Sequence, residues 1–370
     1  MQCQCKSYDT PCILVHGDVG NICDAHIIEK MTSCKNAAST GYASLLSGAS
    51  SVQAVEIALW WLECDEFFNC GYGSVLNDIG DVQMDACIID GLKLECGSVA
   101  AISDVEHPIS LARYVLDNFP NSIIVGEGAR KLIDYAKLNQ LSQGNMIAPM
   151  AYLAYDKLKE IDSSDINLDV EQPLGTLKNG GNTVGCIAYD GYAIASGVTS
   201  GGLNKKLMGS VGDSSMFGYS TYADRDIGCS LTGHGESIMK LGLSRTIAIN
   251  IEEGCSPQKA LRKNLDYMST RYNHTFGGIV FKRSGEWDVY FTSYKMPYAV
   301  IMNDCVTFGI TLDERNVEKY TEYRKGSERI SCNCSYPFVN SCILQRNIIQ
   351  TLSFDRALLF LFHSRFSLLS

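Results

Sequence analysis

The chain has 370 residues, a formal net charge of -10 at pH 7, 46% hydrophobic residues and 19% charged residues. This is the balance of a globular protein with enough apolar residues for one large domain or two ordinary ones. We expect no nucleic-acid partner, because an acidic chain without a local basic patch is repelled by phosphates. We expect no membrane partner either, because the most apolar segment, Leu352–Leu369, contains two arginines, an aspartate and a histidine.

The first quarter of the chain predicts a buried strand followed by two helices. The apolar run Cys12–Val15 ends in a glycine turn, which is typical of a buried strand. A helical pattern then extends from about Ala25 to Leu46. Ser50 and Gln53 have the spacing of a capping box, which predicts the start of a second helix.

Strand-forming residues and glycines dominate residues 69–102 and predict a meander of strands. His107-Pro108 then begins a predicted helix that ends near Phe119. From about residue 139 to residue 182 the apolar pattern decays into a stretch rich in Gln, Ser, Asp, Lys and Gly. This composition predicts a mobile linker.

Regular structure resumes at Thr183. Residues 183–189 and 192–198 predict a hairpin around Asp190-Gly191, a preferred two-residue turn. Two helices and a second hairpin are predicted further on, over residues 236–253, 256–272 and 277–293. Hairpins flanked by helices favour antiparallel sheets covered by helices, which is an α+β fold.

The chain therefore divides into three parts: residues 1–182 with the linker at their end, residues 183–315, and a tail over residues 316–370. The tail is charged, then rich in cysteine, then apolar, and we do not expect it to join the core.

Sixteen cysteines are scattered singly along the chain. The nearest neighbours, Cys3/Cys5 and Cys332/Cys334, lack the spacing of a zinc site. The polar first residues have no apolar core and do not predict a secretory signal. We therefore expect a cytoplasmic protein whose thiols are mostly reduced and packed as small apolar side chains.

Seven short stretches between about residues 12 and 312 follow one another in a recognisable order. They are Val15–Gly17, Phe68–Asn77, Met84–Ala86, Thr183–Gly185, Ser200–Gly202, Gly212–Ser214 and Thr232–Glu236. Each motif is weak alone, but together they resemble the plant-type L-asparaginase/isoaspartyl peptidase family. The likeness is greatest to the cytosolic animal branch, through Tyr222–Asp224.

The resemblance implies a four-layer αββα sandwich, made as one inactive chain that cuts itself before a threonine. The new N-terminal threonine then hydrolyses the side-chain amide of asparagine or the isopeptide bond of β-aspartyl dipeptides. It also implies a small-molecule or dipeptide substrate, a homodimer of α/β units and no cofactor for catalysis.

The nucleophile implied by the resemblance is Thr183, with autocleavage between Asn182 and Thr183. A threonine hydroxyl needs a base beside it, and the freed α-amine, with an ordinary pKa of about 7.7–8.0, can be that base. Taken alone, Thr183 is better interpreted as a β-branched residue that begins a strand; the surrounding motifs reverse this preference. His16 and His234 are then structural or pocket-lining residues, because the amine already supplies the base.

Other site residues come from the same comparison. The Ser200 hydroxyl is expected to hydrogen-bond the nucleophile and hold its rotamer. Thr232 and Gly233 precede a helix and suit an oxyanion hole, whose donors contribute roughly 3–4 kcal/mol. Asn69 and Gly235 are expected to line the substrate pocket. The alternative for each of these residues is an ordinary position in a glycine-rich turn.

A structural sodium ion is also implied, bound by backbone carbonyls in the loop over residues 62–72. The carbonyls are those of Leu62, Glu63, Asp65, Phe68, Cys70 and Tyr72. Such a site leaves little signature in side chains.

The first departure from the family is Ser210. Relatives have an arginine here that clamps the substrate α-carboxylate, while the aspartate at the position of Asp213 holds the α-ammonium. Loss of a buried pair of this kind costs roughly 2–5 kcal/mol. Lys205 or Lys206 is a candidate to reach the pocket as a point charge, although a lysine is not a fork.

Two further departures concern cleavage. Asn182 stands where close relatives have glycine, and asparagine tolerates a positive φ better than most residues do. Asp18-Val19 replaces small residues and is expected to disturb the geometry near the cleavage site. We predict that the fold and the nucleophile are kept while activity on free asparagine is low or lost.

Alternatives remain open. One is a catalytically silent homologue that is uncut or unable to bind substrate. Another is an altered-specificity threonine protease, although Gly212-Asp213 and Thr232–Gly235 favour the asparaginase branch. A lysosomal glycosylasparaginase is a third, disfavoured by the absence of a signal-like segment.

Overall fold

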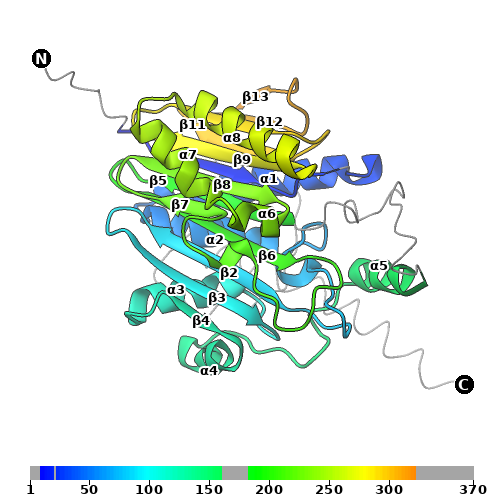
Figure 1. The fold of residues 1–370 in the computed structure, drawn as a ribbon. Coiled ribbons are helices and arrows are strands. Elements are labelled where there is room, and N and C mark those ends of the chain that lie inside the picture. Colours follow the sequence, from blue (N-terminus) through cyan, green and yellow to red (C-terminus); the bar gives the residue numbers. More distant parts are fainter. Residues whose placement is uncertain (1–8, 21, 161–181, 322–370) are drawn as a thin grey trace, which may run out of the picture.

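The computed structural model describes residues 9–20, 22–160 and 182–321 (Figure 1). Two sheets form its centre. The larger has nine strands, in the order β13 (Asn316–Lys319), β12 (Cys305–Gly309), β11 (Tyr298–Met302), β1 (Cys12–His16), β5 (Asn182–Tyr189), β6 (Ile194–Gly202), β2 (Met84–Asp90), β3 (Glu95–Ile102) and β4 (Ile123–Val125). The smaller has four, in the order β10 (Trp287–Phe291), β9 (Phe276–Lys282), β8 (Ile227–Gly233) and β7 (Thr221–Ala223).

The order of the large sheet differs from the order of the chain. Strand β1 pairs antiparallel with both β5 and β11, and β6 pairs antiparallel with both β5 and β2. Only β3 and β4, among the described strands, pair in parallel. The middle strands β1, β5 and β6 are buried almost throughout, as expected of strands between two covering layers, although they include polar residues such as Thr183 and Ser200.

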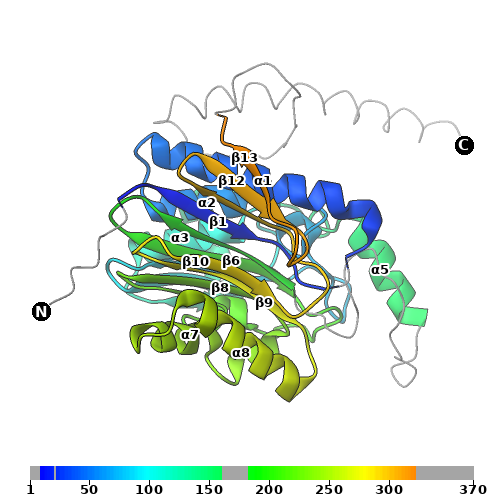
Figure 2. The same ribbon diagram turned by 90° about the horizontal axis from the view of Figure 1, so that it is seen from above.

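Helices cover the outer face of each sheet, as Figure 2 shows from above. Helices α1 (Ile27–Leu46), α2 (Ser51–Glu63), α3 (Pro108–Asn118) and α4 (Gly126–Ala136) pack on the large sheet. Helices α7 (Leu243–Glu252) and α8 (Pro257–Tyr272) pack on the small one. The predicted α+β fold with four αββα layers is therefore confirmed.

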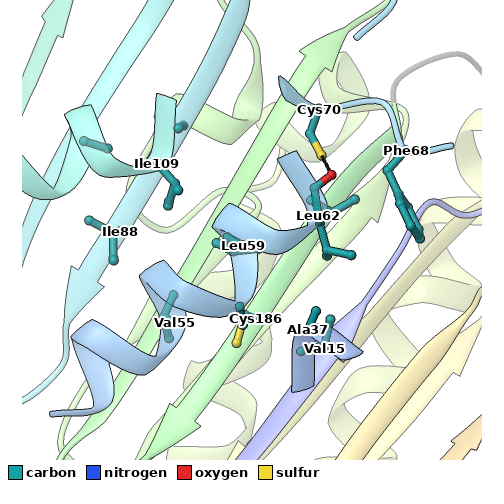
Figure 3. Packing of buried hydrophobic residues seen from close by; sticks show 14 of the residues in the cluster. Val15, Ala37, Val55, Leu59, Leu62, Phe68, Cys70, Ile88, Ile109 and Cys186 are labelled. Carbon is teal, nitrogen blue, oxygen red and sulfur yellow. Dashed lines mark hydrogen bonds between the residues drawn. The ribbon is translucent and has the colours of Figure 1, made fainter. Parts of the chain in front are cut away.

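Three apolar clusters separate these layers. In the outer cluster of the large sheet, Leu59 and Leu62 of α2 lie above the strand residues Val15 and Cys186 (Figure 3). Burial of such side chains contributes about 1.5–3 kcal/mol each, so this packing fixes the position of the loop that follows α2.

Several predicted boundaries are confirmed. Ser50 caps α2 by accepting a hydrogen bond from the backbone N–H of Gln53 at 3.3 Å. Both predicted hairpins are present as β5/β6 and β9/β10. The single helix predicted over residues 236–253 is wrong, because the chain forms α6 (Gly235–Met239) and α7 separately. Gly242 lies between them with a φ of 55°, a left-handed conformation that interrupts a right-handed helix.

The other differences lie in the linker and the tail. Residues 149–160, inside the predicted linker, form helix α5 (Pro149–Glu160), and residues 161–181 lie outside the described part of the chain. The first residues of the tail form β13, which pairs with β12, and Tyr320 packs edge-on against Tyr42. Residues 322–370 lie outside the described part. No helix of the described residues is long and apolar enough to cross a membrane.

Candidate active site

Thr183 lies near the start of β5, in the middle of the large sheet, and is 2% exposed. Asn182 pairs with Gly202 and Val184 pairs with Thr199, so the pairing register shifts at Thr183. Two residues of β6, Ser200 and Gly201, therefore oppose this one threonine. A bulge of this kind re-aims side chains.

The two polar groups of Thr183 contact different elements. Its backbone N–H donates to Thr232 Oγ1 at 3.0 Å, and Thr232 belongs to β8 of the small sheet. Its hydroxyl lies 3.1 Å from Ser214 Oγ, in the short 3-10 helix η4 (Asp213–Ser215). Both partners are buried. Thr183 thus joins the two sheets, and its hydroxyl orientation is set by Ser214.

The carbonyl oxygen of Asn182 is held by two side-chain donors. Ser200 Oγ donates at 2.8 Å and Asn69 Nδ2 donates at 3.1 Å. The prediction that Ser200 hydrogen-bonds the Thr183 hydroxyl is wrong, because Ser200 binds the preceding carbonyl and Ser214 makes the expected contact. The cause is the bulge, which places Ser200 beside the peptide bond that joins Asn182 to Thr183.

Asn69 is itself fixed from several sides. Its side-chain oxygen accepts the Val75 N–H at 3.0 Å, and its Nδ2 also donates to the Gly202 carbonyl at 2.8 Å. Its backbone N–H donates to Asp18 Oδ2 at 3.2 Å. An amide held on each polar atom has little freedom, so its donor is pre-oriented toward Asn182.

Asp18 contacts the loop that carries Asn69, and its expected effect on cleavage stays a prediction. Its buried carboxylate forms an ion pair of 3.3 Å with Lys30 of α1, whose ammonium also donates to the Phe67 carbonyl and lies over the Phe68 ring. Burial raises the pKa of the Asp18 carboxyl, and Lys30 opposes this rise. The pair supports the loop that carries Asn69.

Glycines are required at two places beside the nucleophile. Gly233 has a φ of 143°, and a Cβ there would lie 2.6 Å from the Thr275 carbonyl oxygen. Gly235 begins α6, and a Cβ there would collide with the Asp213 carboxylate. Gly235 also lines the pocket in front of Thr183, and its role in substrate binding stays a prediction. The oxyanion role of Thr232 and Gly233 stays a prediction.

A pocket opens in front of Thr183. Its lining combines the nucleophile, small residues and charged side chains: Asp85, Thr183, Ser200, Gly202, Leu203, Lys206, Ser210, Gly212, Asp213, Ser214, Gly235 and Glu236. Ser210 lines it where an arginine was expected in the family pattern. Of the two candidate lysines only Lys206 reaches the pocket, because Lys205 Nζ donates to the Leu158 carbonyl of α5 at 2.9 Å.

Three charged residues that line the pocket, Asp213, Asp85 and Lys206, are buried. Burial, assisted by the charge of Asp85, raises the pKa of the Asp213 carboxyl to about 7. Burial likewise raises the pKa of Asp85, opposed by the charge of Lys206. Burial lowers the pKa of the Lys206 ammonium, and Asp85 opposes that change. Each of these carboxylates and the ammonium therefore carries a desolvation cost that a bound ligand of opposite charge would reduce.

The two histidines near the site contact other side chains outside the pocket. His16 Nε2 lies 2.8 Å from Ser230 Oγ between the sheets, and burial lowers the pKa of His16 to about 4. A Cβ on Gly185 would collide with both groups. His234 Nδ1 contacts Ser237 Oγ at 2.9 Å and its ring stacks on His274. Neither His16 nor His234 lines the pocket.

The profile of the asparaginase family matches residues 9–310. The chain is 35% identical over 309 residues to the isoaspartyl peptidase/L-asparaginase of Xenopus laevis, covering 83% of this chain and 97% of that protein. It is 36% identical over 305 residues to the protein of the same name in Mus musculus, covering 82% and 91%. The human protein of that name is 35% identical over 310 residues, covering 83% and 98%.

The chain belongs to the asparaginase family. Within this asparaginase-family chain, sequence reasoning missed Ser214 and Asp85 as residues of the site. Both lie inside stretches that carry the resemblance, Gly212–Ser214 and Met84–Ala86. A motif marks such residues as interesting, but only the fold shows that Ser214 touches the Thr183 hydroxyl and that Asp85 Oδ2 accepts the Gly212 N–H at 2.7 Å.

The loop after α2 is the place where the asparaginase-family resemblance implies a sodium ion. The carbonyl oxygens of Asp65 and Glu66 both lie 2.8 Å from the position that a Cβ of Gly73 would take, and the Phe68 carbonyl crowds the same point. Two of the six predicted carbonyls, those of Asp65 and Phe68, thus converge. Carbonyl oxygens are ligands that hard cations prefer, and a sodium ion in this loop stays a prediction. The described residues contain no cluster of three or more His, Cys, Asp or Glu side chains that suits a metal.

Proposed function

We propose that this chain is an amidohydrolase precursor that cuts itself between Asn182 and Thr183. The freed Thr183 then hydrolyses L-asparagine or β-aspartyl dipeptides, at a rate lowered by Ser210. The observation that carries the proposal is the carbonyl oxygen of Asn182, which accepts hydrogen bonds from both Ser200 and Asn69. The relatives named isoaspartyl peptidase/L-asparaginase supply the substrate class.

The two donors suit the first step of self-cleavage. Attack of Thr183 Oγ1 on the Asn182 carbonyl carbon moves negative charge onto the carbonyl oxygen, where Ser200 and Asn69 already donate. Such preorganised donors are worth roughly 2.7–4 kcal/mol each in a transition state. The C–N bond then breaks, the hydroxyl proton passes to the leaving nitrogen, and an ester joins the two halves. Water hydrolyses the ester and restores the Thr183 hydroxyl.

The amine freed by this reaction stays in a defined place. Thr232 Oγ1, which accepts the Thr183 N–H at 3.0 Å in the intact chain, would hold the same nitrogen as an α-amine. That amine can accept the hydroxyl proton when Thr183 attacks an amide substrate. The attack releases ammonia or an amino acid and forms an acyl-enzyme, which water then hydrolyses to free aspartate.

One observation supports a second candidate function, that of a catalytically silent homologue. Ser210 lines the pocket, and a serine cannot form the two parallel hydrogen bonds that a guanidinium gives to a carboxylate. A protein that cuts itself but holds no amino acid would have the nucleophile without its substrate.

Time-resolved denaturing gels of the purified chain separate these candidates, with Thr183→Ala as the uncut reference. We expect two fragments whose new N-terminus is Thr183, and slow release of L-aspartate from L-asparagine or a β-aspartyl dipeptide. A chain that stays intact, like Thr183→Ala, would refute the proposed enzyme. A cut chain that releases no aspartate would favour the silent homologue.

Three further proposals accompany this function. The carbonyl loop after α2 would bind a sodium ion that stabilises the fold without taking part in the chemistry, which a higher melting temperature in sodium chloride than in choline chloride would support. The active form would be a homodimer, measurable by light scattering. The chain would work in the cytoplasm, where the eleven free cysteines of its described part stay reduced.

A further inference from the structure

The pocket in front of Thr183 contains two opposite charges that do not bond to each other. Lys206 is 8% exposed as a residue, and its Nζ is buried without a hydrogen-bond partner among the described residues. Asp213 Oδ2 is also buried, and no described group donates to it. Both residues line the same pocket. An unsatisfied cation and an unsatisfied anion in one pocket are complementary to a zwitterion.

The direction of Lys206 is fixed by the backbone around it. Its carbonyl accepts the Asp78 N–H at 2.9 Å, and its own N–H donates to the Leu203 carbonyl at 3.2 Å. Gly202 leaves room for the ammonium, because a Cβ there would lie 2.8 Å from Lys206 Nζ. The neighbouring Lys205 points away to α5. The ammonium is therefore held in the pocket by a turn and by the absence of a side chain opposite it.

Among the described residues, no carboxylate forms an ion pair with this ammonium. The charge of Asp85 acts on this ammonium, but Asp85 Oδ1 accepts the Ala101 N–H at 2.8 Å and Asp85 Oδ2 accepts the Gly212 N–H at 2.7 Å. A buried ammonium without a partner destabilises a folded protein, and such groups gather at functional sites. What Lys206 lacks is one anion with free oxygen atoms.

We propose that Lys206 binds the α-carboxylate of the substrate in place of an arginine at position 210, while Asp213 binds the α-ammonium. This inference rests on the proposed function for its substrate class, L-asparagine or a β-aspartyl compound. An ammonium binds a carboxylate as a single point charge, whereas a guanidinium forms two parallel hydrogen bonds with it. Lys206 would therefore keep the carboxylate contact but fix the orientation of the substrate less strictly.

The test compares Lys206→Met with Lys205→Met, a matched change at the neighbouring lysine that faces away from the pocket. Calorimetric titration measures binding of L-aspartate, and of its α-carboxamide, which lacks the α-carboxylate. We expect Lys206→Met to weaken L-aspartate binding by at least about thirtyfold, the loss typical of a truncated buried charge pair. Binding of the α-carboxamide should be unchanged, and Lys205→Met should behave as the unaltered chain.

Several results would overturn the proposal. One is a Lys206→Met protein that binds L-aspartate as tightly as the unaltered chain, and another is an equal loss for both ligands. An unaltered chain that binds no L-aspartate would overturn it as well. Melting curves exclude misfolding, because replacing an unpaired buried ammonium by methionine should not lower the melting temperature.

The outcome is distinguishable from failure of the proposed function. If the chain stays uncut but binds L-aspartate through Lys206, the enzyme proposal fails and the binding proposal stands. If the chain cuts itself and releases aspartate, and Lys206→Met leaves KM unchanged, the enzyme proposal stands and the binding proposal fails.

Discussion

Replacing Ser200 by alanine should slow self-cleavage strongly while the fold is kept. In the intact chain Ser200 Oγ donates to the Asn182 carbonyl at 2.8 Å, and Asn69 Nδ2 donates at 3.1 Å. The alanine variant leaves Asn69, among the residues that the structure describes, as the only side-chain donor to the developing oxyanion. Loss of one such donor costs roughly 10²–10³ in rate, or about 2.7–4 kcal/mol. A chain that cuts within hours would then need weeks.

The assay follows the intact band and both fragments on denaturing gels at fixed protein concentration. Ser200→Thr is the matched control, because threonine keeps a hydroxyl on the same carbon and should restore most of the rate. If the Ser200 hydroxyl served only the fold, its removal would lower the melting temperature and leave the cleavage rate near that of the unaltered chain. Cleavage of Ser200→Ala at the unaltered rate would refute the role of this hydroxyl.

Three other changes test neighbouring parts of the argument. Ser210→Arg should raise kcat/KM for L-asparagine by roughly 10- to 150-fold, the effect of a hydrogen bond to a charged group, and an unchanged value would show that the pocket does not use this position. Because the pKa of Asp213 is raised to about 7, lowering the pH from 8 to 6 neutralises its carboxylate. The KM for an ammonium-bearing substrate should therefore rise roughly tenfold over this range. Asp213→Asn should abolish this pH dependence of KM. Gly185→Ala places a methyl group against His16 and Ser230, which should destabilise the fold by about 1–3 kcal/mol and lower the melting temperature by several degrees; an unchanged melting curve would contradict the packing.

Local patterns predicted those parts of the fold whose causes are local. The cap at Ser50 and the hairpin at Asp190-Gly191 depend on a few adjacent residues, and both are present. The break at Gly242 was missed because the apolar period continues across it, while a single left-handed φ ends the helix. The αββα layering was available only through the resemblance to a family.

The site was harder to predict because its contacts join distant residues. The partners of Asp18 could not be predicted, because its carboxylate pairs with Lys30 of α1 and accepts the backbone N–H of Asn69. Nothing in the sequence separates Lys205 from Lys206. The structure does so through a φ of 54° at Lys205, which turns consecutive side chains toward helix and pocket.

The strand order determines whether the two fragments stay together and can refold after cleavage. Strands β1 to β4 precede the proposed cut, strands β5, β6 and β11 to β13 follow it, and blocks of the two kinds alternate across the large sheet. The two fragments would remain hydrogen-bonded along β1/β5, β1/β11 and β6/β2, so the cut leaves one folded body. Folding must therefore come first. An intact chain can unfold and refold as one molecule, whereas the two fragments of a cut chain must meet again in solution to refold. Unfolding after cleavage would therefore be much harder to reverse than unfolding before it.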